Sequence, residues 1–310
     1  MVAASPRREV HRAGLASPDR QVIGIGHASG RVSVSPAELK VQPEGILWLT
    51  GCRADRWEQH MQYIKAQRRG RALWITFDRP DKLNILHPED LSELRDVIAG
   101  LDSGVRAIVF TGAGQAAFSA GMNIEAFVRL TPDGAQALIG DLAQVMRAIR
   151  HSPVVTVAAI NGYCLGAAFE LALACDLRVV APAASFGLPE IKVGVPSVID
   201  AALLPAFVGL SKAREMVLTG DIYTLDQLPP DSIANVVAEP GELAAAVESV
   251  LDRVATHPPA VTAAQRRLFD IWLNNGLDAS VNASMTEFAQ VFASQETHDQ
   301  IARHHKRITG

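Results

Sequence analysis

The sequence has few cysteines, no basic excess and no long apolar run, and each lack excludes a class of protein. Three cysteines occur among 310 residues, and they form neither a CxxC pair nor a zinc-ligand spacing. A formal net charge of −4 and a pI near 6.1 give no global attraction to nucleic acid or anionic membranes. Charged residues or glycine interrupt every apolar run before the roughly 20 residues that a membrane helix needs. We expect a cytoplasmic protein without nucleic-acid, membrane or metal partners.

Several catalytic motifs are also missing. The sequence has no GxSxG elbow, which argues against a nucleophilic hydrolase, and it has no P-loop. The glycine-rich residues 24–30 lack the GxGxxG spacing. Residues 1–60 contain scattered Arg, Gly, Ser and Pro with little periodicity, so we expect a poorly ordered N-terminal extension. Its acidic residues Glu9, Asp19 and Glu38 do not fit the composition of a transit peptide.

Beyond this extension, apolar strands alternate with amphipathic helices. Residues 72–80 and 106–112 read as buried strands, and residues 88–101 read as a helix with Pro88 in its first turn. Strands that are apolar on both sides indicate a parallel or mixed sheet covered on both faces. The expected fold class is therefore α/β.

The last 70 residues have a different pattern, with helical periodicity throughout. Four helices are expected over residues 242–256, 260–275, 277–294 and 297–307. Their apolar residues, such as Trp272 and Phe288, are suited to packing on the core or on a neighbouring subunit. We expect a C-terminal helical subdomain.

The stretch from 159 to 190 contains the strongest functional signal. An Asn-Gly turn follows a buried strand, a helix opens at Gly166, and the carboxylates Glu170 and Glu190 lie on either side of a further strand. A helix start carries unpaired N–H groups and the positive end of a dipole, so negative charge is stabilised there. This arrangement predicts a site for a developing anion.

A small-residue loop over 112–127 supplies a second possible set of backbone donors. The N–H of Ala120 in this loop and the N–H of Ala167 at the helix start would together form an oxyanion hole. Glu170 lies three residues after Ala167 and therefore on the same helical face. Loop and helix together predict acyl chemistry.

At these residues the chain resembles the enoyl-CoA hydratase/isomerase, or crotonase, superfamily. The resemblance covers about 72–307 and rests on four ordered motifs: FDRPDKLN, VFTGAGQAAFSAGMNI, the stretch through FGLPEIKVGVP, and VGLSKAREMVLTG. It implies a crotonase-like spiral of ββα units over 61–240, a C-terminal helical oligomerisation region over 241–310, and assembly as a homotrimer or dimer of trimers. It also implies an acyl-CoA substrate of the kind found in fatty acid metabolism, with no separate cofactor.

The resemblance further implies roles for individual residues. Ala120 and Ala167 would be the oxyanion-hole donors, Glu170 the base on water and Glu190 the acid. Two carboxyls in one dry cleft push their proton affinities apart, which suits a reaction that needs both an acid and a base. The expected reaction is hydration of a 2-enoyl-CoA; the alternatives are an enoyl-CoA isomerase and a non-catalytic acyl-CoA-binding scaffold. The substrate-binding residues would be Lys82, Leu83, Gly121, Met122, Asn123 and Gly166.

Three departures from the family pattern affect the expected pocket. The helix opens with Gly166-Ala167-Ala168, whose two methyl groups would narrow the acyl pocket. Asn123 stands where an aspartate is common, and SVIDAALLP follows Pro196 where a glycine-rich segment is usual. Asp200, on the following helix, is either a third acid of the pocket or a structural residue. Among other basic residues, Arg79 and Lys212 are weaker candidates for CoA phosphate contacts.

Overall fold

The computed structural model describes residues 39–41, 47–49 and 62–309, and the chain divides into two units between residues 53 and 54. In the first unit, β1 (Leu39–Val41) pairs antiparallel with β2 (Leu47–Leu49). The rest of the extension predicted for residues 1–60, including Cys52, lies outside the described residues. All other elements belong to the second unit.

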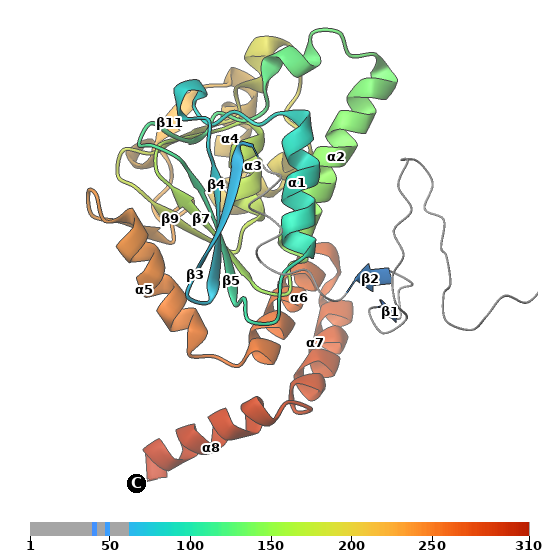
Figure 1. The fold of residues 1–310 in the computed structure, drawn as a ribbon, viewed down its shortest axis with the longest axis vertical. Coiled ribbons are helices and arrows are strands. Elements are labelled where there is room, and N and C mark those ends of the chain that lie inside the picture. Colours follow the sequence, from blue (N-terminus) through green and yellow to red (C-terminus); the bar gives the residue numbers. More distant parts are fainter. Residues whose placement is uncertain (1–38, 42–46, 50–61, 310) are drawn as a thin grey trace, which may run out of the picture. The chain divides into compact units, whose positions relative to one another are not determined.

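A six-stranded sheet forms the centre of the second unit (Figure 1). In spatial order its strands are β12 (Val236–Val237), β9 (Leu177–Val180), β7 (Val155–Ile160), β5 (Ala107–Gly112), β4 (Ala72–Phe77) and β3 (Ile64–Arg69). Only β3 runs antiparallel to its neighbour. Every residue of β7 is buried; five of the six are apolar, and the Thr156 hydroxyl donates to Asp176.

A second, four-stranded sheet has the order β11 (Ile222–Thr224), β10 (Ser185–Gly187), β8 (Tyr163–Leu165) and β6 (Ala117–Ser119). The chain alternates between the two sheets and then forms a helix: β5–β6–α2, β7–β8–α3 and β9–β10–α4. The helices of this part are α1 (Pro88–Ala99), α2 (Pro132–Arg150), α3 (Ala167–Ala174) and α4 (Leu204–Thr219). The predicted spiral of ββα units is therefore confirmed.

Five short 3-10 helices connect these elements: η3 (Pro80–Lys82), η4 (Ile124–Phe127), η5 (Pro189–Val193), η6 (Ile199–Leu203) and η7 (Leu225–Gln227). Local chemistry explains several helix starts. Proline occupies the first turn of α1 and α2, and the Thr131 side chain accepts the Gly134 N–H at the start of α2. The amphipathic pattern read from residues 88–101 thus gives a helix within one or two residues of its expected ends.

The six-stranded sheet separates two hydrophobic cores. Ile108 and Phe110 of β5 face the larger core with α1, α2 and α3, whereas Ala107 and Val109 face the smaller core with α5 (Leu243–Ala255). Figure 1 shows α5 on one side of the sheet and α1 and α2 on the other. Successive strand residues point to opposite faces, so two covered faces require an apolar residue at nearly every position.

Three helices follow α5: α6 (Pro259–Asn274), α7 (Leu277–Val291) and α8 (Gln295–Thr309). The C-terminal region is helical, as expected. However, α5 packs on the sheet through Val247, Val250 and Leu251, so the helical run from residue 241 does not begin a separate packing unit. Only α6 to α8 lie beyond the two-sided core.

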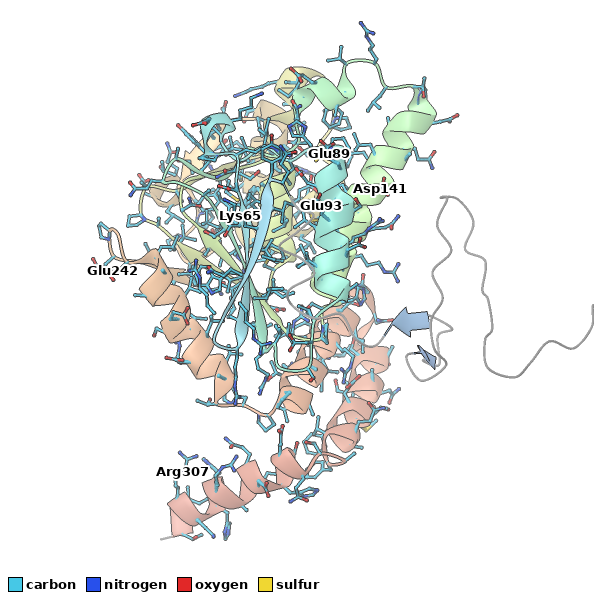
Figure 2. The ribbon with its side chains drawn as sticks, in the orientation of Figure 1. Lys65, Glu89, Glu93, Asp141, Glu242 and Arg307 are labelled. Atoms are coloured by element: carbon cyan, nitrogen blue, oxygen red, sulfur yellow. The ribbon has the colours of Figure 1, made fainter. Side chains whose placement is uncertain are left out.

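The exterior and the buried thiols agree with a globular fold. Figure 2 shows Lys65, Glu89, Asp141, Glu242 and Arg307 on the outside of the described elements, and all five are exposed. No helix in the described part of the chain is both long and apolar enough to cross a bilayer. Cys164 and Cys175 are buried free thiols, and burial raises the pKa of both.

Candidate active site

An apolar cavity of about 590 Å³ lies at the N-terminal end of α3. Four segments line it: the loop after β6, helix α2, the start of α3, and residues 189–198. The lining residues are Ala120, Met122, Ile124, Phe127, Ala135, Gln136, Ile139, Leu142, Gly166, Ala167, Glu170, Pro189, Glu190, Lys192, Val193, Val195, Pro196 and Val198. Lys192, the basic residue of this lining, pairs with Asp221 at 2.9 Å. The acidic residues of the lining are Glu170 and Glu190.

Helix α3 presents its first turn to this cavity. Gly166, at φ 56° and ψ −133°, turns the chain from β8 into α3, and all eight residues of α3 are buried. Ala167 is the first helical residue, and its N–H has no acceptor among the described residues. Both alanines belong to the hydrophobic core, but only Ala167 is also among the residues that line the cavity, so Ala168 does not narrow the pocket directly.

The loop after β6 lies against this helix start through Gly121. Gly121 has φ +86°, and a Cβ added there would lie 2.7 Å from the Leu165 carbonyl and 3.2 Å from the Ala167 nitrogen. Only glycine permits so close an approach at this backbone conformation. Loop and helix therefore present their backbone groups to the same cavity, as the sequence predicted.

The structure does not support Ala120 as the loop donor. The Ala120 N–H already donates to the Leu83 carbonyl at 2.9 Å. Met122 is the alternative: it forms an isolated parallel bridge with Leu86 in which the bonds run from Leu86 N–H to Gly121 and from Asn123 N–H to Leu86. The Met122 N–H takes no part in that bridge and has no acceptor among the described residues. The Ala120 assignment failed because sequence shows which amides lie in a loop but not which are already bonded.

Glu170 and Glu190 meet in the cavity from different elements. Glu170 lies on α3 with 2% of its surface exposed, and its Oε2 accepts the Asp200 N–H at 3.0 Å. Glu190 lies on η5, and its Oε2 accepts the Ser197 hydroxyl at 2.7 Å. A Cβ added to Gly166 would lie 2.9 Å from Glu190 Oε1, so this carboxylate reaches the backbone at the start of α3.

The surroundings of the two carboxyls give them different proton affinities. Burial and the neighbouring Glu190 raise the pKa of Glu170 to about 8. Burial also raises the pKa of Glu190, but the Ser197 hydroxyl stabilises its ionised form. With a pKa of about 8, Glu170 keeps its proton at neutral pH. A protonated Glu170 is suited to act as the acid, whereas the sequence-based roles make Glu170 the base and Glu190 the acid.

The other predicted binding residues separate into two groups. Met122 and Gly166 line the cavity, and Gly121 lies directly behind it. Asn123 caps η4 by accepting the Glu125 N–H at 3.2 Å, so the loop is anchored without an aspartate. Lys82 and Leu83 lie outside the lining, although the Leu83 carbonyl holds the loop at Ala120.

Two of the additional basic candidates have structural partners. Arg79 forms a buried ion pair with Asp90 and lies 3.9 Å from the centre of the Tyr63 ring. Lys212 pairs with Glu215 at 3.0 Å and lies over Tyr223. Neither lines the cavity. These contacts place both side chains in the scaffold.

Sequence reasoning missed Ser197, Arg150 and the α2 wall. Ser197 stands in the segment that departs from the family pattern, and that departure was the only signal for it. Arg150 ends α2 and pairs with Asp200, a contact between residues 50 apart in the chain. The α2 wall comes from Ala135, Ile139 and Leu142, whose i, i+4, i+7 spacing also fits an ordinary core stripe.

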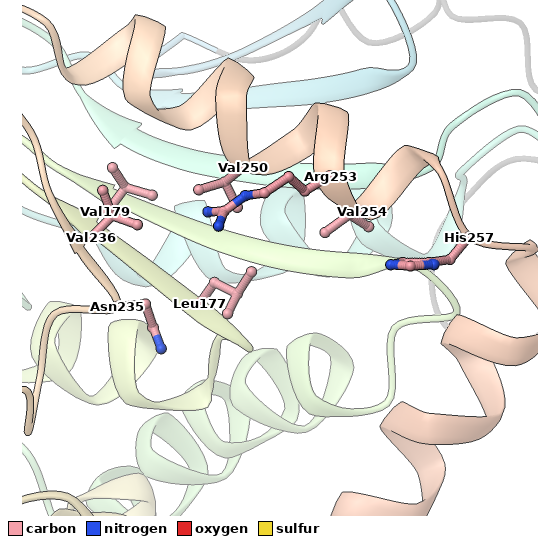
Figure 3. A pocket seen from close by; sticks show the side chains of 8 residues that line it. All are labelled: Leu177, Val179, Asn235, Val236, Val250, Arg253, Val254 and His257. Carbon is pink, nitrogen blue, oxygen red and sulfur yellow. The ribbon is translucent and has the colours of Figure 1, made fainter. Parts of the chain in front are cut away.

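A second cavity, of about 350 Å³, lies between α5 and the outer face of the sheet (Figure 3). Its apolar lining includes Leu177, Val179 and Val250, and the basic side chains of Arg253 and His257 also line it. Among the described residues, no carboxylate lines this cavity. The acid pair therefore distinguishes the cavity at α3 as the candidate active site.

The fold and the site define a class of protein: a ββα spiral that places the buried Glu170 and the partly buried Glu190 beside backbone N–H groups that have no acceptor among the described residues. The family model for enoyl-CoA hydratase/isomerase matches residues 68–307. The chain belongs to this family.

Individual relatives agree with this assignment. The chain is 26% identical to a short-chain-enoyl-CoA hydratase of Clostridium acetobutylicum, over 75% of this chain and 90% of that protein. It is 29% identical to a crotonyl-CoA hydratase of Syntrophomonas wolfei, over 72% and 86% of the two chains. A solved enoyl-CoA hydratase from Thermoplasma volcanium superposes with a TM-score of 0.73 at 25% identity, covering 78% of this chain and 96% of that one.

Proposed function

We propose that the protein hydrates a 2-enoyl-CoA thioester to a 3-hydroxyacyl-CoA and catalyses the reverse dehydration. The observation that carries this proposal is the pairing of Glu170 with Glu190 in one apolar cavity beside the free Ala167 N–H. Hydratases among the relatives support the same reaction. Coenzyme A is part of the substrate, and hydration transfers no electrons, so the reaction needs no redox cofactor.

The Met122 and Ala167 N–H groups would bind the thioester oxygen. Negative charge develops on this oxygen as water adds to the conjugated double bond, and each oxyanion-hole donor typically contributes about 10²–10³ in rate. Ala167 also lies at the positive end of the α3 dipole. The close contact at Gly121 keeps the two donors on the same side of the cavity.

The glutamate pair would manage the protons. In hydration the water oxygen bonds to C3, one carboxylate takes the water proton, and the other carboxyl gives a proton to C2. If hydration begins with Glu170 protonated, Glu190 accepts the water proton and Glu170 donates its proton to C2. In dehydration the two glutamates exchange these roles. A proton exchange across the pair gives the order implied by the family resemblance. Both orders need one proton on the pair.

The proposed assembly is a homotrimer or a dimer of trimers. The C-terminal helices expose large apolar residues, including Phe269, Trp272, Leu277, Met285 and Phe288. Association of chains would remove such a surface from water. We also propose a cytoplasmic location, since free buried thiols are typical of reducing compartments.

The test mixes the protein with crotonyl-CoA and a panel of branched and aromatic enoyl-CoAs. Loss of the conjugated double bond is followed by absorbance, and products are identified by mass and retention. Glu170→Gln and Glu190→Gln should each lower kcat by about 10²–10⁴. Glu248→Gln, the same change at an exposed position of α5, should leave kcat unchanged.

Three results would contradict the proposal. Full hydration by both glutamine variants would remove the two-acid mechanism. Positional isomers without a 3-hydroxyacyl product would identify an isomerase. Binding of enoyl-CoA without turnover would identify an acyl-CoA-binding scaffold.

The pH profile tests the shared proton. Because the pair holds its proton up to a pKa of about 8, kcat/KM should fall as the pH rises through about 8. A profile that instead rises through this pH would show that the doubly ionised pair is the active form.

A further inference from the structure

Glu170 is held by a turn that does not itself line the cavity. Its Oε2 accepts the Asp200 N–H, and Asp200 lies in the first turn of η6, which continues directly into α4. The Asp200 side chain is 5% exposed and points to Arg150 at the end of α2. Neither Arg150 nor Asp200 is among the cavity residues.

The turn has an unfavourable backbone conformation that needs outside support. Ile199, directly before Asp200, has φ 50°. A β-branched side chain is strained in this left-handed region, because its Cβ substituents crowd the backbone. The contact between Asp200 and Arg150 ties this turn to a long helix.

The charges around Glu170 also require a counter-ion. Glu190 faces it from η5 and Asp200 from η6, and both carboxylates disfavour its ionised form. Arg150 supplies the positive charge to this cluster of carboxylates, because one of its nitrogens contacts both Asp200 carboxylate oxygens. Because Arg150 neutralises Asp200, Glu190 is the main charge that raises the pKa of Glu170.

Arg150 is itself fixed by a buried residue of α6. One Arg266 nitrogen donates to the carbonyls of Ile149 and Arg150, at 3.0 and 3.2 Å, and its Nε pairs with Asp176. The C-terminal end of α2 is thereby held where the Arg150 side chain reaches η6. A continuous set of contacts runs from α6 through α2 and η6 to Glu170.

We propose that Arg150 and Asp200 are positioning residues for Glu170: their ion pair locks the η6 turn whose backbone N–H holds the Glu170 carboxylate. This inference rests on the proposed hydratase function and extends it to two residues outside the cavity. Removing the pair releases Glu170 from its working position without changing what binds the substrate.

The kinetic test compares Arg150→Met with Arg147→Met. Arg147 lies one turn earlier on α2 and is exposed, so its variant is a matched control. Arg150→Met should lower kcat about 10²-fold with KM within about threefold, since misplacing a catalytic group by 1 Å has an effect of this size. Arg150→Lys should recover most of the rate, because a single ammonium can meet both Asp200 oxygens.

The same substitution in a Glu170→Gln background separates positioning from general damage. If Arg150 acts through Glu170, adding Arg150→Met to Glu170→Gln should lower kcat by less than threefold. An equal loss in both backgrounds would overturn the proposal, as would an unchanged kcat in Arg150→Met.

A titration makes the outcome independent of turnover. The ¹³C carboxyl signal of Glu170, identified by its absence in Glu170→Gln, should titrate near 8 in the native protein. Arg150→Met should move its midpoint up, because Asp200 is no longer neutralised, and Asp200→Asn should move it down. Arg147→Met should not move it. Unchanged midpoints in both pair variants would overturn the positioning role, whereas shifted midpoints in a protein that hydrates no enoyl-CoA would overturn only the proposed function.

Discussion

The first turn of α3 and the C-terminal helices are both rich in apolar residues, yet they have opposite environments. All eight residues of α3 are buried, and Glu170 among them is held by backbone from another element. In α7, by contrast, Ser280 is the buried residue, while Leu277, Met285 and Phe288 are exposed. The apolar residues of α3 are covered by other parts of the same chain, whereas those of α7 are left exposed.

This difference separates two uses of apolar residues. Around α3 they exclude water, which strengthens the interaction between charges and N–H groups in the cavity. On α6 to α8 they expose apolar surface to water, which is unfavourable in free energy, and association with further copies would bury that surface. Changes in shape around α3 should therefore lower the reaction rate, whereas changes in the C-terminal helices should alter assembly first.

Disrupting the contact between Gly121 and the start of α3 should have the largest effect on activity. Gly121→Ala places a Cβ against the Leu165 carbonyl and the Ala167 nitrogen at a left-handed φ, so the loop must move away from α3. We expect kcat to fall about 10²–10³-fold, as for loss of an oxyanion-hole donor. Steady-state kinetics measure this. Gly140→Ala in α2, with open space around it, is the control and should keep full activity; an active Gly121→Ala variant would show that the contact is dispensable.

A charge on the exposed apolar face should act on assembly and not on chemistry. Phe288, 68% exposed, packs edge-on against Phe292. If this face lies between subunits, Phe288→Asp should weaken association by at least about 2 kcal/mol, the scale of an interface hot spot. Sedimentation velocity over a range of concentrations measures the change, and Thr286→Asp on the same helix is the control. A native protein that sediments as a monomer would contradict the proposed trimer.

The raised pKa of Glu170 should make stability depend on pH. The unfolded chain ionises this carboxyl near its ordinary value of 4.5, whereas the folded chain keeps the proton until about 8. Between these values the folded state binds more protons, so the free energy of unfolding should fall with rising pH, by at most about 1.4 kcal/mol per pH unit. Urea unfolding at several pH values measures the slope. Glu170→Gln should flatten it, and an equal slope in that variant would assign it to other groups.

The smallest effect is expected at the α2 wall. Ile139→Phe places a larger side chain in the cavity wall and leaves less room for the acyl group. The kcat/KM for a long or aromatic enoyl-CoA should therefore fall about tenfold relative to crotonyl-CoA. Ile301→Phe, at an exposed site on α8, is the matched control. An unchanged preference would place the acyl group elsewhere.

Much of the fold followed from local patterns, but parts of the site did not. The strands β4 and β5 and the helix α1 appear where the apolar pattern placed them, because burial on one or two faces leaves a direct trace in sequence. Glu170, Glu190 and the Ala167 amide were found because they lie within one short stretch. Met122 was proposed only as a substrate contact, since the bond that occupies Ala120 comes from Leu83, a residue 37 positions away.

The sequence by itself determined the alternation of strands and helices and the two acids beside a helix start, because these depend on residue type and near neighbours. The tertiary structure decided which amides are free, which glutamate keeps its proton, and what holds Glu170 in place. Each of these depends on contacts that the folded chain makes: Leu83 with Ala120, Ser197 with Glu190, and Arg150 with Asp200. Hydrogen bonding and desolvation act through space, so only the folded chain defines them.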